Sequence, residues 1–160
     1  MMQDYVKDLR ATIESATPKL LEISDDDSAR PVKTGNWCPR QIIGHLIDSA
    51  ANNHRRFVTG QYQDDLVFAG YDGDQWVDAQ QYKSADWKDL VSLWKAYNLH
   101  LRRVMEVAPE ELRLQQRNRH NFDQIASRTV SPDQPTTLDY LMEDYVVHLK
   151  HHLRQILGSL

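Results

Sequence analysis

The sequence predicts an all-α fold, a four-helix bundle. Gly and Pro, at six residues each among 160, are too few for a chain of short strands joined by tight turns. Four stretches of about 20 residues place apolar side chains at alternating three- and four-residue steps, which is the period of an amphipathic helix. Four such helices can bury one shared core without a sheet. The length fits a single domain over residues 1–160.

The first helix is expected over residues 4–23, where the apolar stripe runs from Val6 to Leu20. Pro18 lies inside this stripe. Proline lacks the backbone N–H that a helix interior needs, so we expect a kink or break there.

The second helix is expected over residues 39–58. Pro39 suits the first helical position, and Gly60 suits the end of the helix. Cys38 would then be the N-cap, with Gln41 completing a capping box in which Cys replaces the usual Ser or Thr.

The third helix is expected over residues 86–107, where Asp86 and Asp89 have capping-box spacing. The fourth begins after Pro135, with Thr136 and Asp139 as its capping pair, and ends near Gly158. About 25 residues separate the second and third helices and about 28 the third and fourth, far more than antiparallel neighbours need. At least one long crossover is therefore expected.

Composition excludes several classes of function. With 23 acidic and 19 basic residues the net charge is −4, and no Lys/Arg block stands out, so we expect no nucleic-acid partner. The longest apolar runs are far shorter than the ~20 residues that cross a bilayer, so we expect no membrane partner. One cysteine allows no internal disulfide, and the start of the chain, Met1 to Tyr5, does not resemble a secretory leader. The expected compartment is the cytoplasm.

Two histidines on the fourth helix are candidates for chemistry. His148 and His152 are four residues apart, so both side chains project from the same face of the helix. They continue the apolar stripe, which points them into the protein. A buried imidazole needs a partner for its polar nitrogens, and either a hydrogen-bond network or a metal ion can supply it. The pair alone leaves both interpretations open.

The second helix adds a polar arc next to its apolar one. At about 100° per residue this arc is made of Gln41, His45, Asp48, Ser49, Asn52 and Arg56. The better candidates for the solvent-facing arc are Arg40, Gly44, Ala51 and Arg55. We therefore expect the polar arc to face the protein or a cavity, although a broad solvated face is the alternative.

If the second and fourth helices are neighbours, His45, His148 and His152 can converge as three ligands and leave a fourth position open. An ion so held can acidify a bound water, bind a thiolate or polarise a carbonyl. Asp48, one turn beyond His45, is a candidate general base or hydrogen-bond acceptor. Its alternative role is an ion pair with Arg55 or Arg56.

Three motifs occur in order along the chain. The first, NWCPRQIIGHLIDS over 36–49, is a Trp followed by a helix with His-x-x-Asp-Ser, and it continues through Asn52 and Arg56. The second is YDGDQW over 71–76, and the third is HLKHH over 148–152. In this combination the sequence resembles the DinB-like superfamily, and within it the YfiT-like branch of metal-dependent hydrolases and bacillithiol-type thiol S-transferases.

The resemblance covers residues 30–158 and implies an up-down-down-up bundle with a long crossover. It also implies one divalent transition metal ion on His45, His148 and His152, with Zn or Ni as the leading candidates, and a homodimer in many members. The branch is chemically diverse. This sequence departs from its pattern at Cys38, where Ser or Thr is more usual. Fold likeness alone does not choose among its activities.

Four residues are candidates for substrate binding. Arg56 can clamp a carboxylate or phosphate through its planar fork, although a buried salt bridge with Asp48 or Asp144 explains it equally well. Asn52 lies on the same arc. Tyr71 and Trp76, together with Trp37, can wall a pocket beside the metal or can be loop and core anchors.

The leading hypothesis is a metal-dependent enzyme that acts on a small molecule. It either hydrolyses its substrate or transfers a low-molecular-weight thiol cosubstrate to an electrophile, with Asp48 accepting or relaying a proton. The alternatives are a non-catalytic metal- or ligand-binding bundle and a metal-free structural bundle.

Overall fold

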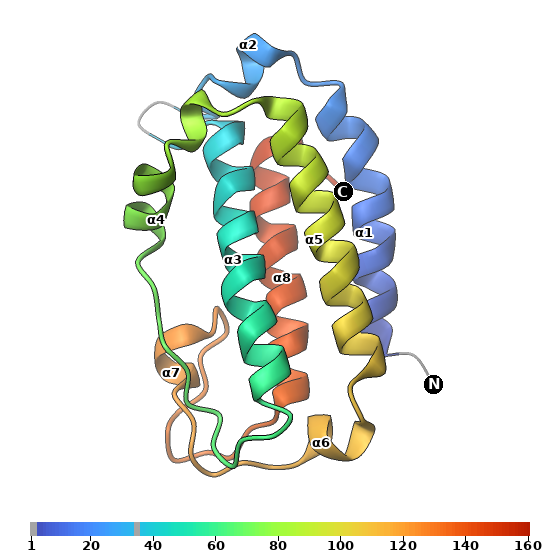
Figure 1. Ribbon diagram of the computed structural model, residues 1–160, viewed down its shortest axis with the longest axis vertical. Coiled ribbons are helices and arrows are strands. Elements are labelled where there is room, and N and C mark those ends of the chain that lie inside the picture. Colours follow the sequence, from blue (N-terminus) through green and yellow to red (C-terminus); the bar gives the residue numbers. More distant parts are fainter. Residues whose placement is uncertain (1–2, 34–35) are drawn as a thin grey trace.

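Four long helices form the bundle in the computed structural model, which describes residues 3–33 and 36–160 (Figure 1). They are α1 (Asp4–Leu21), α3 (Pro39–Thr59), α5 (Trp87–Val107) and α8 (Leu138–Leu157). In Figure 1, α1 and α8 run upward while α3 and α5 run downward. Each of α1 and α3 packs against both α5 and α8. The predicted all-α bundle with up-down-down-up topology is confirmed.

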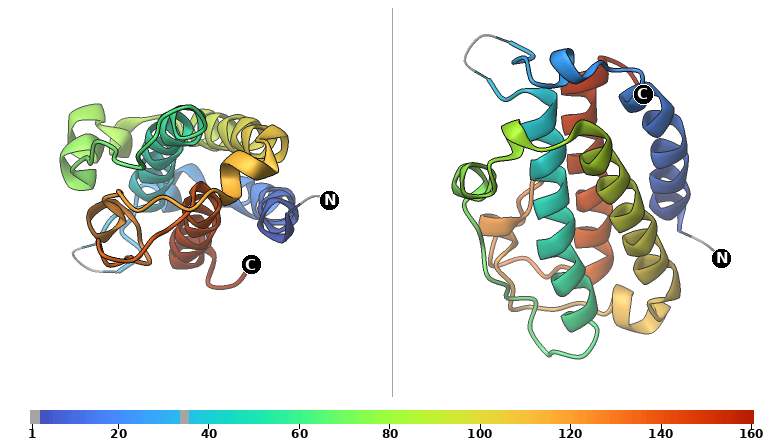
Figure 2. Two further views of the ribbon diagram at one scale, coloured as in Figure 1. Left: turned by 90° about the horizontal axis from the view of Figure 1, so that it is seen from below. Right: turned by 45° about the horizontal axis from the view of Figure 1, so that its top comes forward.

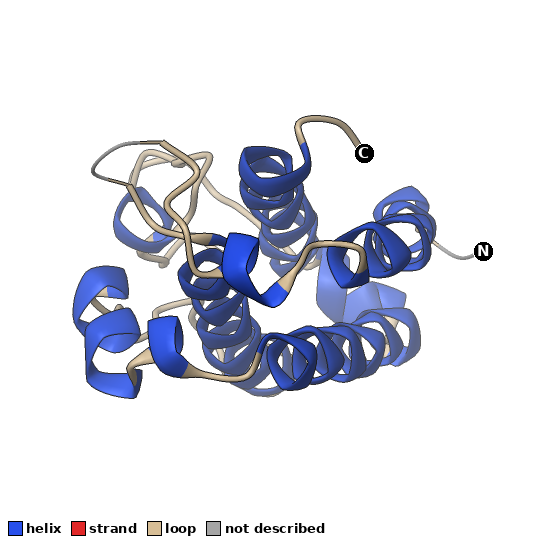
Figure 3. Ribbon diagram, turned by 90° about the horizontal axis from the view of Figure 1, so that it is seen from above, coloured by secondary structure: helices blue, strands red, loops and turns tan. Residues whose placement is uncertain are grey.

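Short helices lie in the connections between the long ones. They are α2 (Asp25–Ser28), α4 (Gly73–Gln80), the 3-10 helix η1 (Tyr82–Ser84), α6 (Glu110–Leu114) and α7 (Phe122–Ile125). The crossover from α3 to α5 carries α4 and η1 along the outer side of α3 (Figure 2). Viewed from above in Figure 3, every regular element of the described residues is a helix. Met1 and Met2, which belong to the segment tested for a leader, lie outside the described residues.

One apolar core lies between the four long helices, and its largest fully buried side chains include Trp94 and Phe57. The buried stripe of α1 contains Val6, as expected. The helix continues through Pro18 to Leu21, so the break expected there does not occur. Pro18 lies in the last turn of the helix. No helix in the described part of the chain is long and apolar enough to span a bilayer.

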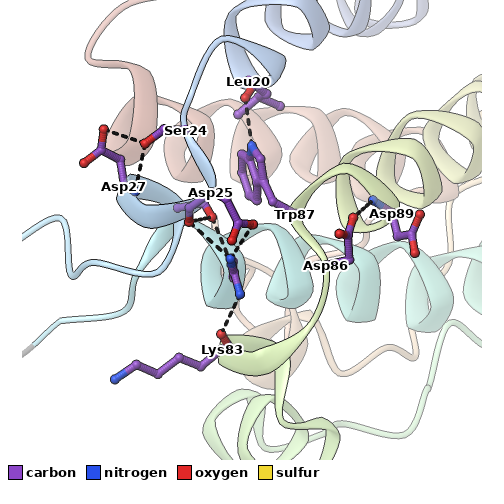
Figure 4. Close-up of polar contacts among 10 residues, drawn as sticks. Leu20, Ser24, Asp25, Asp27, Lys83, Asp86, Trp87 and Asp89 are labelled. Carbon is purple, nitrogen blue, oxygen red and sulfur yellow. Dashed lines mark hydrogen bonds and ion pairs between the residues drawn. The ribbon is translucent and has the colours of Figure 1, made fainter.

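Side chains at the helix ends follow the expected capping chemistry with one exception. The Gln41 side chain accepts from the backbone N–H of Cys38 at 3.0 Å, and Asp86 accepts from the N–H of Asp89 at 2.9 Å (Figure 4). The predicted cap of α8 is wrong by one residue. Thr137 is the N-cap and accepts from the N–H of Tyr140.

The reason is a bridge that uses the backbone of Thr136. Its N–H and carbonyl are both bonded to the backbone of Arg117, at 3.1 and 2.8 Å. The carbonyl of an N-cap accepts the first hydrogen bond of its helix, and the Thr136 carbonyl already accepts from Arg117, so the helix starts after it.

The prediction that Arg40 and Gly44 of α3 face solvent is also wrong, because α2 and the crossover cover this end of the helix. Arg40 is only 8% exposed. Its guanidinium donates to the Asp25 carboxylate at 2.6 Å and to the Lys83 carbonyl at 3.2 Å; both partners are labelled in Figure 4. Gly44 faces the ring of Tyr82, and a Cβ there would lie 2.2 Å from the ring. Of the four residues of the predicted solvent-facing arc, only Arg55 is exposed.

Candidate metal centre

Three imidazoles meet between α3 and α8. Nε2 of His148 lies 3.4 Å from Nε2 of His45 and 3.1 Å from Nε2 of His152. One ligand nitrogen from each ring lies within 4.8 Å of the other two. The expected convergence of α3 and α8 therefore occurs, and metal binding by these rings stays a prediction.

The polar arc of α3 explains why His45 faces inward. His45 is 9% exposed, Asp48 and Ser49 are 2% exposed, and Arg56 is 5% exposed. The arc packs against α8 and is covered from outside by the crossover, so the alternative of a solvated face is wrong. Apolar residues of the adjoining arc, such as Ile43 and Leu46, fill the core.

The three histidines are held neutral at pH 7. Burial, followed by the nearby His152, lowers the pKa of His45 to about 4. Burial and the neighbouring imidazoles lower the pKa of His148 to about 3. Burial also lowers the pKa of His152, while its bond to Gln155 acts in the opposite direction. Neutral imidazoles are the form that binds metal ions.

The outer nitrogens of two rings bear on whether a metal fits. Nδ1 of His152 lies 2.9 Å from Oε1 of Gln155. An N–H donated there leaves the lone pair of Nε2 free, which is the usual arrangement of a metal-ligating histidine. Nδ1 of His45 is buried without a partner in the described residues, and a Cβ at Gly73 would lie 3.4 Å from it.

The spacing of the rings fits a metal ion. Ligand nitrogens lie ~3.3 Å apart around a tetrahedral ion bound at ~2.0–2.1 Å, close to the two measured separations of 3.1 and 3.4 Å. Neutral rings, converging lone pairs and an oriented Nδ1 make the cluster a suitable donor set for one divalent transition metal ion.

Asp48 is held by the crossover. Its Oδ1 accepts from the Tyr82 hydroxyl at 2.6 Å and from the Gln80 amide at 2.8 Å. Its Oδ2 is buried and has no partner in the described residues, and burial raises the pKa of the carboxyl. The alternative of an ion pair with Arg55 or Arg56 is wrong, because no such pair lies within 4.0 Å.

An open pocket of about 550 Å³ lies beside the cluster. His152 and Trp37 line it, and Trp37 also packs against His45 with ring centroids 5.1 Å apart. Lys33, Asp74 and Arg154 supply charges to its wall. The volume is in the range typical of small-molecule sites.

The four predicted substrate residues are not all in one place. Arg56 and Tyr71 line a second, smaller cavity, with the guanidinium carbon 6.0 Å from the ring centroid. Trp76 packs against Tyr71 with ring centroids 5.3 Å apart and is 38% exposed, which suits a loop anchor. The Asn52 amide donates to the backbone carbonyl of Asp48. Substrate binding by all four stays a prediction.

Sequence reasoning missed three polar partners of the site. Gln155 has a local signal, since it lies three residues beyond His152 on the same helix. Gln80 and Tyr82 have no such signal in the sequence. They reach Asp48 from the crossover, and hydrophobic periodicity does not predict the path of a long connection.

Comparisons with known proteins agree with the resemblance drawn from the motifs. The family model described as "DinB superfamily" matches residues 8–156. "Putative metal-dependent hydrolase YfiT" of Bacillus subtilis (strain 168) is 23% identical over 134 residues, which are 84% of this chain and 70% of that protein. A protein of Bacillus licheniformis, also described as "Putative metal-dependent hydrolase", is 26% identical over 101 residues, 63% of this chain and 56% of that protein.

A solved structure has the same fold. It is described as "YfiT from Bacillus subtilis is a probable metal-dependent hydrolase with an unusual four-helix bundle topology". The TM-score is 0.77 at 20% sequence identity, and the match covers 96% of this chain and 82% of that chain. At this identity the likeness shows the fold.

Proposed function

The chain belongs to the DinB superfamily, and on that premise we propose that it is a metal-dependent enzyme acting on a small molecule. His45, His148 and His152 hold one divalent transition metal ion. Hydrolysis is the leading reaction class, in agreement with the descriptions of the two similar Bacillus proteins.

One observation carries the proposal: three neutral imidazole nitrogens converge at ligand spacing. Burying three polar rings side by side is unfavourable unless their nitrogens gain partners. A metal-free structural bundle would gain more from apolar side chains at these positions. Three histidine ligands also leave a coordination position open, which is typical of catalytic sites.

The protein residues around the ion have separate roles. When bound, the ion supplies a Lewis acid that polarises a carbonyl or acidifies a water molecule. Gln155 orients His152 through Nδ1. Asp48 accepts or relays a proton at Oδ2, since its Oδ1 is already occupied by Tyr82 and Gln80. Its raised pKa favours taking up a proton.

Thiol transfer is the second candidate reaction. The open pocket of about 550 Å³ beside His152 has room for a low-molecular-weight thiol next to an electrophile. Lys33 and Arg154 in its wall suit an anionic cosubstrate. Zn and Ni are the leading metals, because imidazole ligands suit both.

The test is a panel of esters, amides and electrophiles, assayed with and without thiol. Protein stripped of metal and then reloaded with Zn or Ni is compared with a His148→Ala variant. Metal-dependent loss of substrate without thiol supports hydrolysis, and loss that requires thiol supports transfer. Tight metal binding without turnover on the whole panel would favour the alternative, a non-catalytic metal- or ligand-binding bundle.

A further inference from the structure

Arg56 is a buried cation without a counter-ion. Its side chain lies on α3 and is 5% exposed. Nη2 donates to the Ala69 carbonyl at 2.9 Å, and Nη1 lies 3.4 Å from Oδ1 of Asn53. Within residues 3–33 and 36–160, no Asp or Glu oxygen lies within 4.0 Å of the guanidinium. Burial of an unpaired charge is costly, so this side chain is expected to gain a partner in the working protein.

A cavity lies against this guanidinium. It has a volume of about 60 Å³ and is lined by Arg56, Ser49, Asn53, Tyr71, Asp144 and His148, among others. This cavity is much smaller than the pocket of about 550 Å³ beside His152, so it suits a small polar group rather than a whole substrate. Because His148 lines the same cavity, a group held here lies next to the histidine cluster.

Asp144 also lines the cavity but is already satisfied by other groups. Its two oxygens accept from the backbone N–H groups of Ser127 and Arg128, both at 2.8 Å. The Arg128 side chain donates to it as well, at 3.2 Å. The charge of Asp144 is therefore compensated by Arg128, and that of Arg56 remains uncompensated.

We propose that Arg56 binds a carboxylate group of the substrate in this inner cavity. A guanidinium fork matches the two oxygens of a carboxylate in plane, and the cavity beside it is small and polar on the Arg56 side. The proposal rests on the proposed function, since it places the rest of the substrate toward the metal site beside His148. It narrows the substrate class to small molecules that carry a carboxylate.

The test measures acetate binding to metal-free protein by NMR titration at constant ionic strength. Removing metal excludes coordination of acetate by an ion. Arg56→Met keeps the length of the side chain and removes the charge, and Arg56→Lys keeps the charge and removes the fork. Arg55→Met is the matched control, because Arg55 is the exposed neighbour on the same helix.

Wild type and Arg55→Met should bind acetate alike, and Arg56→Met should bind it at least about tenfold more weakly. The affinity of Arg56→Lys for acetate should lie between those of wild type and Arg56→Met. If Arg56→Met does not fold, the comparison of Arg56→Lys with wild type tests the proposal. Equal binding by wild type and Arg56→Lys, or by wild type and folded Arg56→Met, would overturn the proposal. So would tighter, Arg56-dependent binding of inorganic phosphate, or no acetate binding by wild type. A failure of the proposed function would appear separately, as absence of bound metal.

Discussion

Replacing Gly44 by Ala tests whether the crossover is packed against α3 beside the site. A Cβ at this position would lie 2.2 Å from Cδ2 and 2.3 Å from Cγ of Tyr82. Non-bonded carbons prefer separations of about 3.5–4.0 Å, so the ring must move by more than about 1 Å. Its hydroxyl donates to Asp48 at 2.6 Å, and a displacement of this size breaks that bond.

The magnitude follows from three effects. Ala is favoured over Gly inside a helix by about 1 kcal/mol. Overpacking costs about 1–3 kcal/mol, and losing a hydrogen bond to a carboxylate costs about 1.5–3 kcal/mol. We expect Gly44→Ala to lower the free energy of unfolding by about 1.5–5 kcal/mol, although the helix itself prefers Ala.

The assay is urea unfolding followed by far-UV circular dichroism. Gly70→Ala is the matched control, because nothing lies within 4 Å of a Cβ there; its effect should stay below about 1 kcal/mol. Gly44→Ala should cost less in a Tyr82→Phe background, where the bond to Asp48 is already absent. If Gly44→Ala is as stable as wild type, the crossover does not pack on α3 as described and the reasoning is refuted.

Three further predictions concern pH, the metal site and a helix cap. Because the pKa values of His45 and His148 lie near 4 and 3 in the folded state, below their ordinary value of 6.5, the unfolded chain takes up protons first as the pH falls. The unfolding free energy of metal-free protein should therefore fall from pH 6.5 toward pH 4, by up to about 1.4 kcal/mol per pH unit for each histidine. Denaturation at several pH values checks this, and an equal slope in His148→Ala would contradict it. Gln155→Ala should weaken Zn binding by about 10- to 100-fold, measured by competition with a chelating dye, because a ligand loses its orienting bond; unchanged affinity would exclude that role. Thr137→Ala should cost about 1 kcal/mol of stability through loss of the α8 cap. If Thr136→Ala costs this much and Thr137→Ala costs nothing, Thr136 is the cap, as the sequence predicted.

Local signals in the sequence were sufficient to predict the four long helices and the pairing of His148 with His152. The step of four from His148 to His152 fixes two rings on one face of α8 whatever the rest of the chain does. Pro39 and Gly60 mark the start and the end of α3, because proline and glycine act on the backbone within one turn. Bringing His45 to the same point required the polar arc of α3 to face α8, which periodicity allowed but did not require.

Contacts between segments far apart in the sequence could not be predicted from local patterns. Arg40 and Gly44 have the spacing of a solvent face, and only the crossover buries them. Thr136 has a good capping sequence, but its backbone pairs with Arg117 instead. The alternative interpretation of Arg56, an ion pair with Asp48 or Asp144, is wrong; Asp144 instead accepts from the backbone of Ser127. In each case a tertiary contact overrides a local preference.

Metal content per chain tests the central claim most directly. Untagged wild type and His151→Ala, which changes an exposed histidine of α8 outside the cluster, should each contain about one divalent transition metal ion. His45→Ala and His148→Ala should lose it while keeping their helical circular dichroism. Wild-type protein that holds no metal after incubation with Zn or Ni, or a His45→Ala variant that holds as much as wild type, would contradict the account.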